Sequence, residues 1–250
     1  MKVAKKRLDQ LLVEKKFCES REKARALILA KKVLISFNGK SFQTAQKPGT
    51  LVPENVKIQI QEEIPYVSRG GLKLEEALRV FDLKVKDWVC LDVGASTGGF
   101  THCLLLKGAQ RVYALDVGKG QLHYSLRKDP RVISMEGINA RYLKEDMFPE
   151  KFDLITVDVS FISLKKVLPS LVFLLKEEGY ILALIKPQFE VGPKFLKKGV
   201  VKDSFLHKKV VDEIWEFAKN LRLNPLGVVQ SPLLGPKGNQ EFFILLKRNF

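Results

Sequence analysis

A glycine-rich turn between a buried strand and a helix constrains this chain more than any other stretch. An apolar run over residues 88–91 predicts a strand, and apolar helical spacing resumes at Phe100. The turn between them, residues 94–99, reads Gly-Ala-Ser-Thr-Gly-Gly and has little side-chain bulk. In open parallel sheets such a turn forms a nucleotide pocket, because a ligand can approach both the bare backbone and the helix N-terminus.

The spacing of these glycines indicates which kind of ligand the turn accepts. It follows G-x-x-x-G-G, whereas a dinucleotide site is expected to show G-x-G-x-x-G. Asp92 precedes the first glycine and Asp116 ends the next expected strand, so two acids stand at neighbouring strand ends. They suit a ligand with an amino-acid part and a ribose, which favours S-adenosylmethionine over a nicotinamide cofactor. A tight turn without any ligand is the alternative.

Strands and helices alternate along the rest of the chain, as a doubly wound parallel sheet requires. The expected strands are 88–93, 111–116, 132–136, 154–158, 180–185, 226–230 and 242–246. The expected helices are 100–107, 125–128, 164–175 and 206–220. A short loop rich in Pro and Gly joins the last two strands, which predicts an antiparallel final strand. Seven strands with this ending are the α/β architecture of Rossmann-like methyltransferases.

The first 62 residues have a different pattern, typical of a small α+β domain. Apolar spacing from Leu8 to Leu12 predicts a first helix, and Ser20 is the expected N-cap of a second one. Short β-type runs follow at 33–37 and 56–60, with a hairpin signal at Asn38-Gly39. We therefore expect one domain over 1–62, a linker over 63–69 and a second domain over 70–250.

The charge of the chain points to a polyanionic partner. The 43 basic residues exceed the 28 acidic ones by 15, and residues 1–63 alone hold 14 basic against seven acidic residues. Nucleic acid is the first candidate partner and an anionic membrane the second. Because no apolar run approaches the roughly 20 residues of a spanning helix and the N-terminus does not resemble a signal peptide, we expect a cytoplasmic protein without a membrane partner.

The cysteines and histidines do not indicate a metal site or a disulfide framework. The three cysteines are widely spaced, and neither a C-x-x-C pair nor a His/Cys pair occurs. We expect no bound metal.

Polar residues at strand ends form a second set of candidates, since ligands gather at the carboxyl edge of such sheets. Asp158 and Lys186 end adjacent apolar strands, and lone charges there cost several kcal/mol unless they pair or meet a substrate. We expect these two to pair, either as a structural ion pair or as part of a site. Apolar spacing predicts a further helix that begins at Leu72. Lys73 lies in its first turn, the unfavourable end for a cation, so it is either a surface lysine or the partner of an anion. The full set is Lys73, Asp92, Asp116, Asn139, Asp158, Lys186 and Glu241.

The N-terminal region resembles the S4 module, a small RNA-binding domain. The matching residues are Arg7-Leu8-Asp9, Ser20-Arg21, Ala24, Ile28, Val33, Asn38-Gly39 and Pro48-Gly49. The glycine that commonly precedes the first strand is replaced within Ala30-Lys31-Lys32. The resemblance implies an RNA-binding helix, and a solvated basic face without a ligand is the alternative. The candidate RNA-binding residues are Arg7, Ser20, Arg21, Arg25, Lys31, Lys32 and Arg69.

The chain from residue 5 to 247 resembles the TlyA family, in which an S4 domain precedes a methyltransferase domain related to FtsJ. The matching motifs are 66–74 (YVSRGGLKL), 92–100 (DVGASTGGF), 158–163 (DVSFIS), 186–190 (KPQFE) and 238–241 (GNQE). The resemblance implies a catalytic set of Lys73, Asp158, Lys186 and Glu241. It implies S-adenosylmethionine as cofactor, which we expect to contact Asp92, Gly94, Ser96, Gly98, Phe100, Asp116, Asn139 and Asp158.

The activity implied by this resemblance is methylation of a ribose 2′-hydroxyl, with cytidine in ribosomal RNA of the small subunit, the large subunit or both as target. We interpret Lys186 as the general base, oriented by Asp158, while Lys73 and Glu241 position the ribose. Alternatively, Lys186 only orients the hydroxyl and the proton leaves after transfer. A non-catalytic RNA-binding protein and a pore-forming haemolysin are the other function classes. The expected partners are ribosomal RNA or ribosomal subunits, and we expect a monomer.

Overall fold

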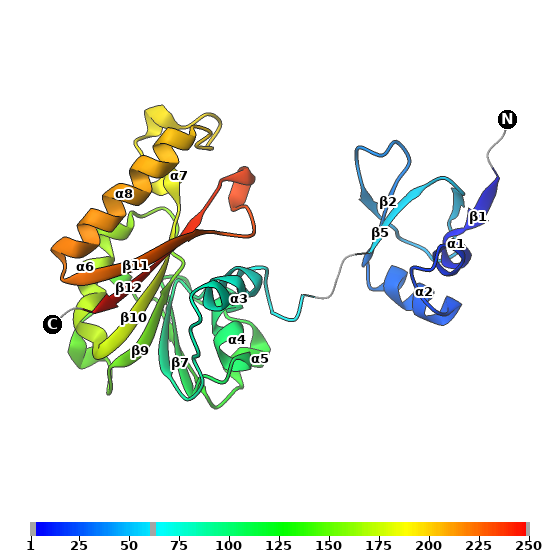
Figure 1. Ribbon diagram of the computed structural model, residues 1–250. Helices are drawn as coiled ribbons and strands as arrows, with labels where there is room; N and C mark the ends of the chain where they lie inside the picture. Colours follow the sequence, from blue (N-terminus) through cyan, green and yellow to red (C-terminus); the bar gives the residue numbers. More distant parts are fainter. Residues whose placement is uncertain (1–3, 61–63, 249–250) are drawn as a thin grey trace. The chain divides into compact units, whose positions relative to one another are not determined.

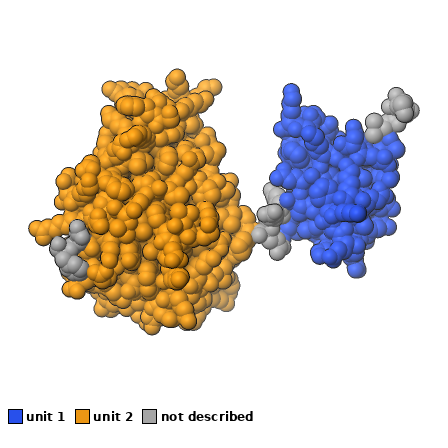
Figure 2. Space-filling model, in the orientation of Figure 1, with its two compact units in different colours: residues 1–63 blue, residues 64–250 orange. Residues whose placement is uncertain are grey.

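The chain folds into two compact units, residues 1–63 and 64–250, which Figure 2 colours separately. This computed structural model describes residues 4–60 and 64–248. The expected linker begins at residue 63, which lies outside the described residues, so only its part from residue 64 can be located. Each unit has its own hydrophobic core.

Unit 1 is a small α+β domain with two short sheets. Its elements are β1 (Lys5–Arg7), α1 (Leu8–Glu14), α2 (Arg21–Leu29), β2 (Val33–Ser36), β3 (Gln43–Thr44), β4 (Leu51–Pro53) and β5 (Lys57–Ile60). The strands pair antiparallel in the orders β3-β2-β5 and β1-β4. Leu8, Leu12 and Ile28 are fully buried between the helices and the sheets.

The two ends of α2 follow from local chemistry. Ser20 is the N-cap, as expected, and its hydroxyl accepts a hydrogen bond from the backbone N–H of Lys23 at 3.2 Å. At the other end the helix stops at Leu29, and Lys31 takes the left-handed conformation with φ 58°. Lys31 therefore fills the role that a glycine commonly has after a helix.

Unit 2 is built on one seven-stranded sheet with helices on both faces (Figure 1). The strands are β6 (Val89–Val93), β7 (Arg111–Asp116), β8 (Val132–Glu136), β9 (Phe152–Val157), β10 (Leu175–Ile185), β11 (Leu223–Gln230) and β12 (Phe242–Arg248). The α-helices are α3 (Gly70–Val80), α4 (Gly99–Leu106), α5 (Tyr124–Arg127), α6 (Leu168–Leu171), α7 (Pro187–Glu190) and α8 (Ser204–Asn220). The short 3₁₀ turns are η1 (Ala140–Tyr142), η2 (Glu145–Met147), η3 (Leu164–Lys166), η4 (Val172–Leu174), η5 (Pro193–Phe195) and η6 (Pro236–Gly238).

The sheet has the order β11-β12-β10-β9-β6-β7-β8, and only β12 runs antiparallel to its neighbours. This confirms the predicted α/β fold with a mostly parallel sheet and an antiparallel last strand. Because β12 lies between β10 and β11, residues at its start come beside the carboxyl end of β10. The ends of β6, β7, β9 and β10 meet at the same edge.

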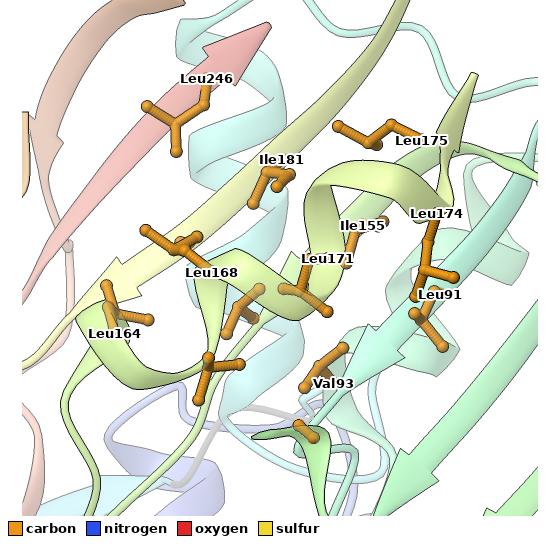
Figure 3. Close-up of a cluster of buried hydrophobic side chains, with 14 of the residues drawn as sticks. Leu91, Val93, Ile155, Leu164, Leu168, Leu171, Leu174, Leu175, Ile181 and Leu246 are labelled. Carbon is orange, nitrogen blue, oxygen red and sulfur yellow. The ribbon is translucent and has the colours of Figure 1, made fainter. Parts of the chain in front are cut away.

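Alternating residues of the strands feed two cores, one on each face of the sheet. Leu91 and Val93 point to the core under α6 and α8, where they lie among other buried aliphatic side chains (Figure 3). Cys90, which precedes Leu91 in the strand, belongs to the opposite core under α3 and α4. A strand that is buried on both faces reads as a nearly continuous apolar run, and in β6 Asp92 interrupts that run.

Several segments differ from the sequence expectation, among them β10, which begins at Leu175 and not at residue 180. The helix predicted over 164–175 is divided into η3, α6 and η4, because Pro169 is tolerated only in the first turn of a helix and so forces a new start at Leu168. Helix α3 begins at Gly70, earlier than the expected Leu72. The edge strand β11 begins at Leu223 and passes a bulge after Pro225, a place where an edge strand accepts proline.

Candidate active site

The turn after β6 is held tightly against its neighbours by the backbone. The N–H groups of Gly94 and Ala95 both donate to the carbonyl oxygen of Leu115, at 2.8 and 3.0 Å. Gly94 has φ 85°, and a Cβ on it would lie 2.5 Å from the carbonyl oxygen of Asp158. Only glycine therefore lets the turn approach the end of β9 this closely.

Asp116 anchors the turn from the neighbouring strand. Its carboxylate accepts backbone N–H groups from Ser96 at 2.8 Å and from Gly118 at 2.7 Å. These bonds fix the carboxylate at the end of β7, where it lines a cavity. Each carboxylate oxygen has a second lone pair, so Asp116 can still accept a hydroxyl group from a ligand.

Two cavities meet at this edge of the sheet. The first, of about 490 Å³, is lined by aliphatic side chains on either side of Asp116, by Asn139 and by the segment after β9. The second, of about 390 Å³, is lined by the start of α3, the start of α4 and the loop before β12. Gly94, Ser96 and Asp158 line both cavities. The first is called the cofactor cavity below, and the second the reaction cavity.

The reaction cavity brings together all four residues of the expected catalytic set. All four line this one cavity, although they come from different elements. Lys73 lies on α3, Asp158 and Lys186 follow β9 and β10, and Glu241 lies in the loop before β12. Lys186 Nζ lies 2.6 Å from Asp158 Oδ1 and donates to Ser160 Oγ at 3.0 Å. The expected pairing of Asp158 with Lys186 is confirmed.

A second ion pair also lines the reaction cavity. Lys73 Nζ donates to Glu241 Oε2 at 2.6 Å, and the Glu241 side chain is fully buried. A Cβ on Gly235 would lie 1.9 Å from Glu241 Oε1, so the absence of a side chain there leaves room for the carboxylate. Of the two alternatives for Lys73, a surface lysine or the partner of an anion, the structure therefore shows the second.

Two carboxylate oxygens in this cavity still have unfilled acceptor directions. Glu241 Oε1 has no hydrogen-bond partner, and Asp158 Oδ1 contacts Lys186 without the angle of a hydrogen bond. Buried acceptors are nearly always satisfied, so such oxygens mark a place where a ligand can donate. With Arg69 also on the wall, the cavity carries three cations and two anions.

Asp92 lies behind the turn and lines neither cavity. It is fully buried, with Oδ2 accepting from the N–H and hydroxyl of Thr101 and Oδ1 accepting from the Thr156 hydroxyl. Burial raises the pKa of this carboxyl to about 6, against the lowering effect of those hydrogen bonds. Its hydrogen bonds therefore join β6 to α4, through Thr101, and to β9, through Thr156.

The other residues expected at the cofactor are divided between the cavities. Asn139 lines the cofactor cavity, Phe100 lines the reaction cavity, and Ser96 lines both. Gly98 lines neither, because it packs against Leu126 as the N-cap of α4, and Gly99 takes its place on the wall.

In unit 1, Arg7 and Arg21 share one buried carboxylate. Arg7 Nη2 lies 2.9 Å and Arg21 Nη2 3.3 Å from Asp9 Oδ2. The hydrogen bond from Arg7 lowers the pKa of Asp9 to about 2. Both guanidinium groups stay about half exposed and are held beside each other.

The remaining expected RNA-binding residues have different surroundings. Arg25 and Lys31 are exposed on α2 and just after it, while Lys32 is partly buried. The Ser20 hydroxyl caps α2. Arg69 belongs to unit 2, where it lines the reaction cavity.

Sequence reasoning did not single out Phe161 and Glu190. Phe161 is 91% exposed, has φ 63° and lies beside Phe189 with ring centroids 5.1 Å apart. Glu190 accepts from Ser163 Oγ at 2.5 Å and from the N–H of Leu164 at 2.8 Å, and burial raises its pKa. Both residues stand in the recognised motifs, but exposure and long-range hydrogen bonds are not visible in a motif.

Two features are absent from residues 4–60 and 64–248. Within those ranges no three His, Cys, Asp or Glu side chains gather in a group that could hold a metal ion. Within the same ranges, no helix has the length and apolar character needed to cross a membrane.

The fold and the site together define a class of protein, the Rossmann-like methyltransferases. Residues 66–248 match the model of the FtsJ-like methyltransferase family, and residues 6–41 match that of the S4 domain. A solved structure from Clostridium acetobutylicum, an S-adenosylmethionine-dependent methyltransferase, shares the fold with TM-score 0.50 and 16% identity over 74% of this chain and 92% of its own.

Relatives with about 40% sequence identity show which family within this class the chain belongs to. The chain is 43% identical to the 16S/23S rRNA (cytidine-2′-O)-methyltransferase TlyA of Mycobacterium tuberculosis, over 96% of this chain and 89% of the relative. It is 40% identical to Hemolysin A of Brachyspira hyodysenteriae, over 94% of this chain and 97% of that one. A solved structure, "Putative hemolysin from Streptococcus thermophilus", matches with TM-score 0.76 and 41% identity over 99% of this chain and 90% of its own. The chain belongs to the TlyA family of FtsJ-like methyltransferases.

Proposed function

We propose that this chain transfers the methyl group of S-adenosylmethionine to a ribose 2′-hydroxyl of RNA, with cytidine in ribosomal RNA as the target. The observation that carries the proposal is the convergence of Lys73, Asp158, Lys186 and Glu241 in one cavity, which adjoins a second cavity at Gly94. The name of the Mycobacterium tuberculosis relative supports the choice of cytidine and of both ribosomal subunits. Action on ribosomal RNA would take place in the cytoplasm.

The residues of the cofactor cavity fit S-adenosylmethionine. Leu115, Val117 and Ile138 offer an apolar surface for an adenine ring, and Asp116 offers a carboxylate to the ribose hydroxyls. When bound, S-adenosylmethionine supplies a methyl group on a positively charged sulfur. Asp158, which lines both cavities, stands where the two ligands would meet.

The two ion pairs of the reaction cavity can bind and orient the target ribose. Lys186 in its uncharged amine form, fixed by Asp158 and Ser160, would accept the proton of the 2′-hydroxyl as the oxygen attacks. Lys73 would hold Glu241, whose unpartnered Oε1 can accept a hydrogen bond from the nucleotide. Alternatively, Lys186 would only orient the hydroxyl, and the proton would leave after transfer.

Phe161 offers a surface for the base of the target nucleotide. Its ring is almost fully exposed beside the shared wall of the two cavities. Sequence-specific RNA recognition commonly stacks an unpaired base on an aromatic side chain. A bulky side chain with positive φ is uncommon, so this exposed position is held at a cost in backbone strain.

Unit 1 would bind the RNA around the target. Arg7 and Arg21, held side by side by Asp9, can contact phosphate groups together with Arg25, Lys31 and Lys32. Such contacts position the RNA and carry little sequence information.

The test is methyl transfer from labelled S-adenosylmethionine to naked ribosomal RNA and to each ribosomal subunit, followed by mapping of the modified nucleotide. We expect a label on a cytidine 2′-oxygen. The Lys186→Ala variant should bind S-adenosylmethionine normally, measured by calorimetry, but lose at least about 100-fold in transfer rate. Lys84→Ala, an exposed lysine before β6, is the matched control. Transfer by Lys186→Ala at the wild-type rate would refute the role of Lys186, and a label on a base would refute the ribose as acceptor.

A further inference from the structure

Five lysines gather on unit 2 at one side of the reaction cavity. Four lie in the segment after α7, which spans 191–202 and contains no acidic residue, and one lies in η6. We call these the lysine patch: Lys194, Lys197, Lys198, Lys202 and Lys237. All five are exposed, and in the described part of the chain none of them forms an ion pair.

The two segments that carry the patch are fastened to each other. The buried side chain of Asn239 accepts from the N–H of Val201 at 3.1 Å and donates to the carbonyl of Gly199 at 3.0 Å. The side chain of Lys237 runs across Gly199, since a Cβ there would lie 3.0 Å from Lys237 Nζ. Figure 1 shows the segment after α7 and the loop before β12 at the same end of unit 2. The hydrogen bonds of Asn239 thus hold the two lysine-bearing segments in fixed positions relative to each other.

The acidic residues on the neighbouring helices have other partners. Glu190 binds Ser163 and Leu164, Asp203 caps α8, and Asp212 pairs with Lys208. The positive charge of the patch is therefore not neutralised locally. Surface lysines that are crowded together without acids repel one another, a cost that an anionic partner removes.

The loop that carries Lys237 also forms part of the wall of the reaction cavity. Leu234, Gly235 and Pro236, which precede Lys237 directly, line that cavity. An RNA strand that places a nucleotide beside Lys186 and Glu241 would pass close to these three residues. A membrane surface would not enter the cavity, so the place of the patch favours a nucleic acid.

We propose that the lysine patch is a second RNA-binding surface, located on the catalytic unit, which contacts backbone phosphates beside the target nucleotide. The inference rests on the proposed RNA substrate and adds a contact that is separate from unit 1. It assigns to unit 2 a share of the salt-dependent affinity for RNA.

The experiment compares two double variants of the full chain, each of which removes two positive charges. Lys197→Gln/Lys198→Gln changes the patch, and Lys84→Gln/Lys86→Gln changes two exposed lysines on the connection before β6. The probe is a fluorescein-labelled RNA stem–loop with single-stranded flanks, followed by anisotropy at several salt concentrations. The patch variant should bind roughly three- to ten-fold more weakly at low salt, and its slope of log affinity against log salt should be about 1.4 smaller, as two lost phosphate contacts on a single strand imply.

The control variant should keep the wild-type affinity and slope, and both variants should keep the wild-type affinity for S-adenosylmethionine. Equal RNA affinity and slope in the two variants would overturn the proposal. So would loss of binding to phosphatidylserine vesicles by the patch variant while its RNA affinity stays at the wild-type value. Because RNA binding is measured without methyl transfer, failure of the proposed activity and failure of this inference can be told apart.

Discussion

Asp92 links the burial of one residue to the pH dependence of stability. Its pKa is raised by burial to about 6, from a reference of 3.8, so between these values the folded chain holds a proton that the unfolded chain releases. The contribution to stability is complete below about pH 4 and is lost as the pH rises through 6. We expect the free energy of unfolding of unit 2 to fall by on the order of 3 kcal/mol across this range.

The measurement is urea unfolding followed by tryptophan fluorescence, since Trp88 and Trp215 both lie in unit 2. The Asp92→Asn variant, which cannot titrate, should lose this fall between pH 4 and 6. Asp87→Asn, which changes an exposed carboxyl of the same unit, should keep it. An unchanged slope in Asp92→Asn would show that another group is responsible.

Gly94 is the residue for which the added volume of a single methyl group should matter most. In Gly94→Ala the new Cβ would meet the carbonyl of Asp158 at 2.5 Å, and the backbone would keep an unfavourable φ of 85°. We expect a loss of about 1–3 kcal/mol in stability and at least about a ten-fold loss of affinity for S-adenosylmethionine, measured by calorimetry. Gly192→Ala is the control, because nothing lies within 4 Å of its Cβ. Normal cofactor affinity in Gly94→Ala would contradict the close approach.

At the residue scale, the sequence predicts charge pairs better than it predicts roles within a site. Asp158 and Lys186 are predictable as a pair because both end apolar strands, where unpaired charge is costly. Asp92 ends a strand too, but the alternation of a strand turns it away from the cavities towards Thr101 and Thr156. The sequence marks all three positions equally, and only the direction of the side chain separates them.

At the scale of elements, Glu190 fastens two segments that carry catalytic residues. It is the last residue of α7, the helix that begins directly after Lys186, and it binds Ser163 and Leu164 beyond the segment that holds Asp158 and Ser160. Glu190→Ala should lower kcat by roughly ten-fold or more with little change in cofactor affinity, because the two segments would no longer be held in register. The measurement is labelled-methyl transfer under saturating cofactor.

The conservative variant distinguishes positioning from general destabilisation. Glu190→Gln keeps an oxygen that accepts from Leu164 and an amide that can donate to Ser163. It should restore most of the kcat that Glu190→Ala loses. Equal loss in both variants would indicate that the negative charge of Glu190 acts on the reaction itself.

Long strands and capped helices are the elements that the sequence predicts well. The strands over 111–116 and 132–136 have the expected bounds, because Gly, Pro or charged residues flank clear apolar runs. The strands β1 and β4 of unit 1 were not expected, since each has three residues and gains its pairing from the other one. A pattern so short cannot be distinguished from a loop without its partner.

For the whole molecule, each unit has a core of its own and a positive net charge. Residues 1–63 hold 14 basic and seven acidic residues, which leaves 29 basic and 21 acidic residues for 64–250. A fragment that begins at residue 64 keeps both cores of unit 2 and both cavities. It should therefore fold and bind S-adenosylmethionine within about two-fold of the full chain.

The same fragment should bind RNA more weakly, with a smaller salt dependence, because the phosphate contacts of unit 1 are gone. Affinity and its salt slope are measured with the labelled stem–loop on the fragment and on the full chain. An RNA affinity equal to that of the full chain would mean that unit 1 adds no contact to RNA.

The architecture of unit 2 is the part of the whole molecule that follows most directly from sequence. Alternating strands and helices determine a parallel sheet, and the short loop before β12 determines its antiparallel end. The lysine patch could not be predicted in this way, because its lysines stand up to 43 positions apart and meet only through the hydrogen bonds of Asn239.

The junction of the two cavities has a consequence for the design of inhibitors. Gly94, Ser96 and Asp158 line both spaces, so a molecule in one cavity would lie directly beside a molecule in the other. A single compound with an adenosine-like arm in the first and a ribose-like arm in the second would gain the contacts of both while losing its freedom of motion only once. Its selectivity would come from the second arm, because the ion pair between Lys73 and Glu241 shapes that end of the site.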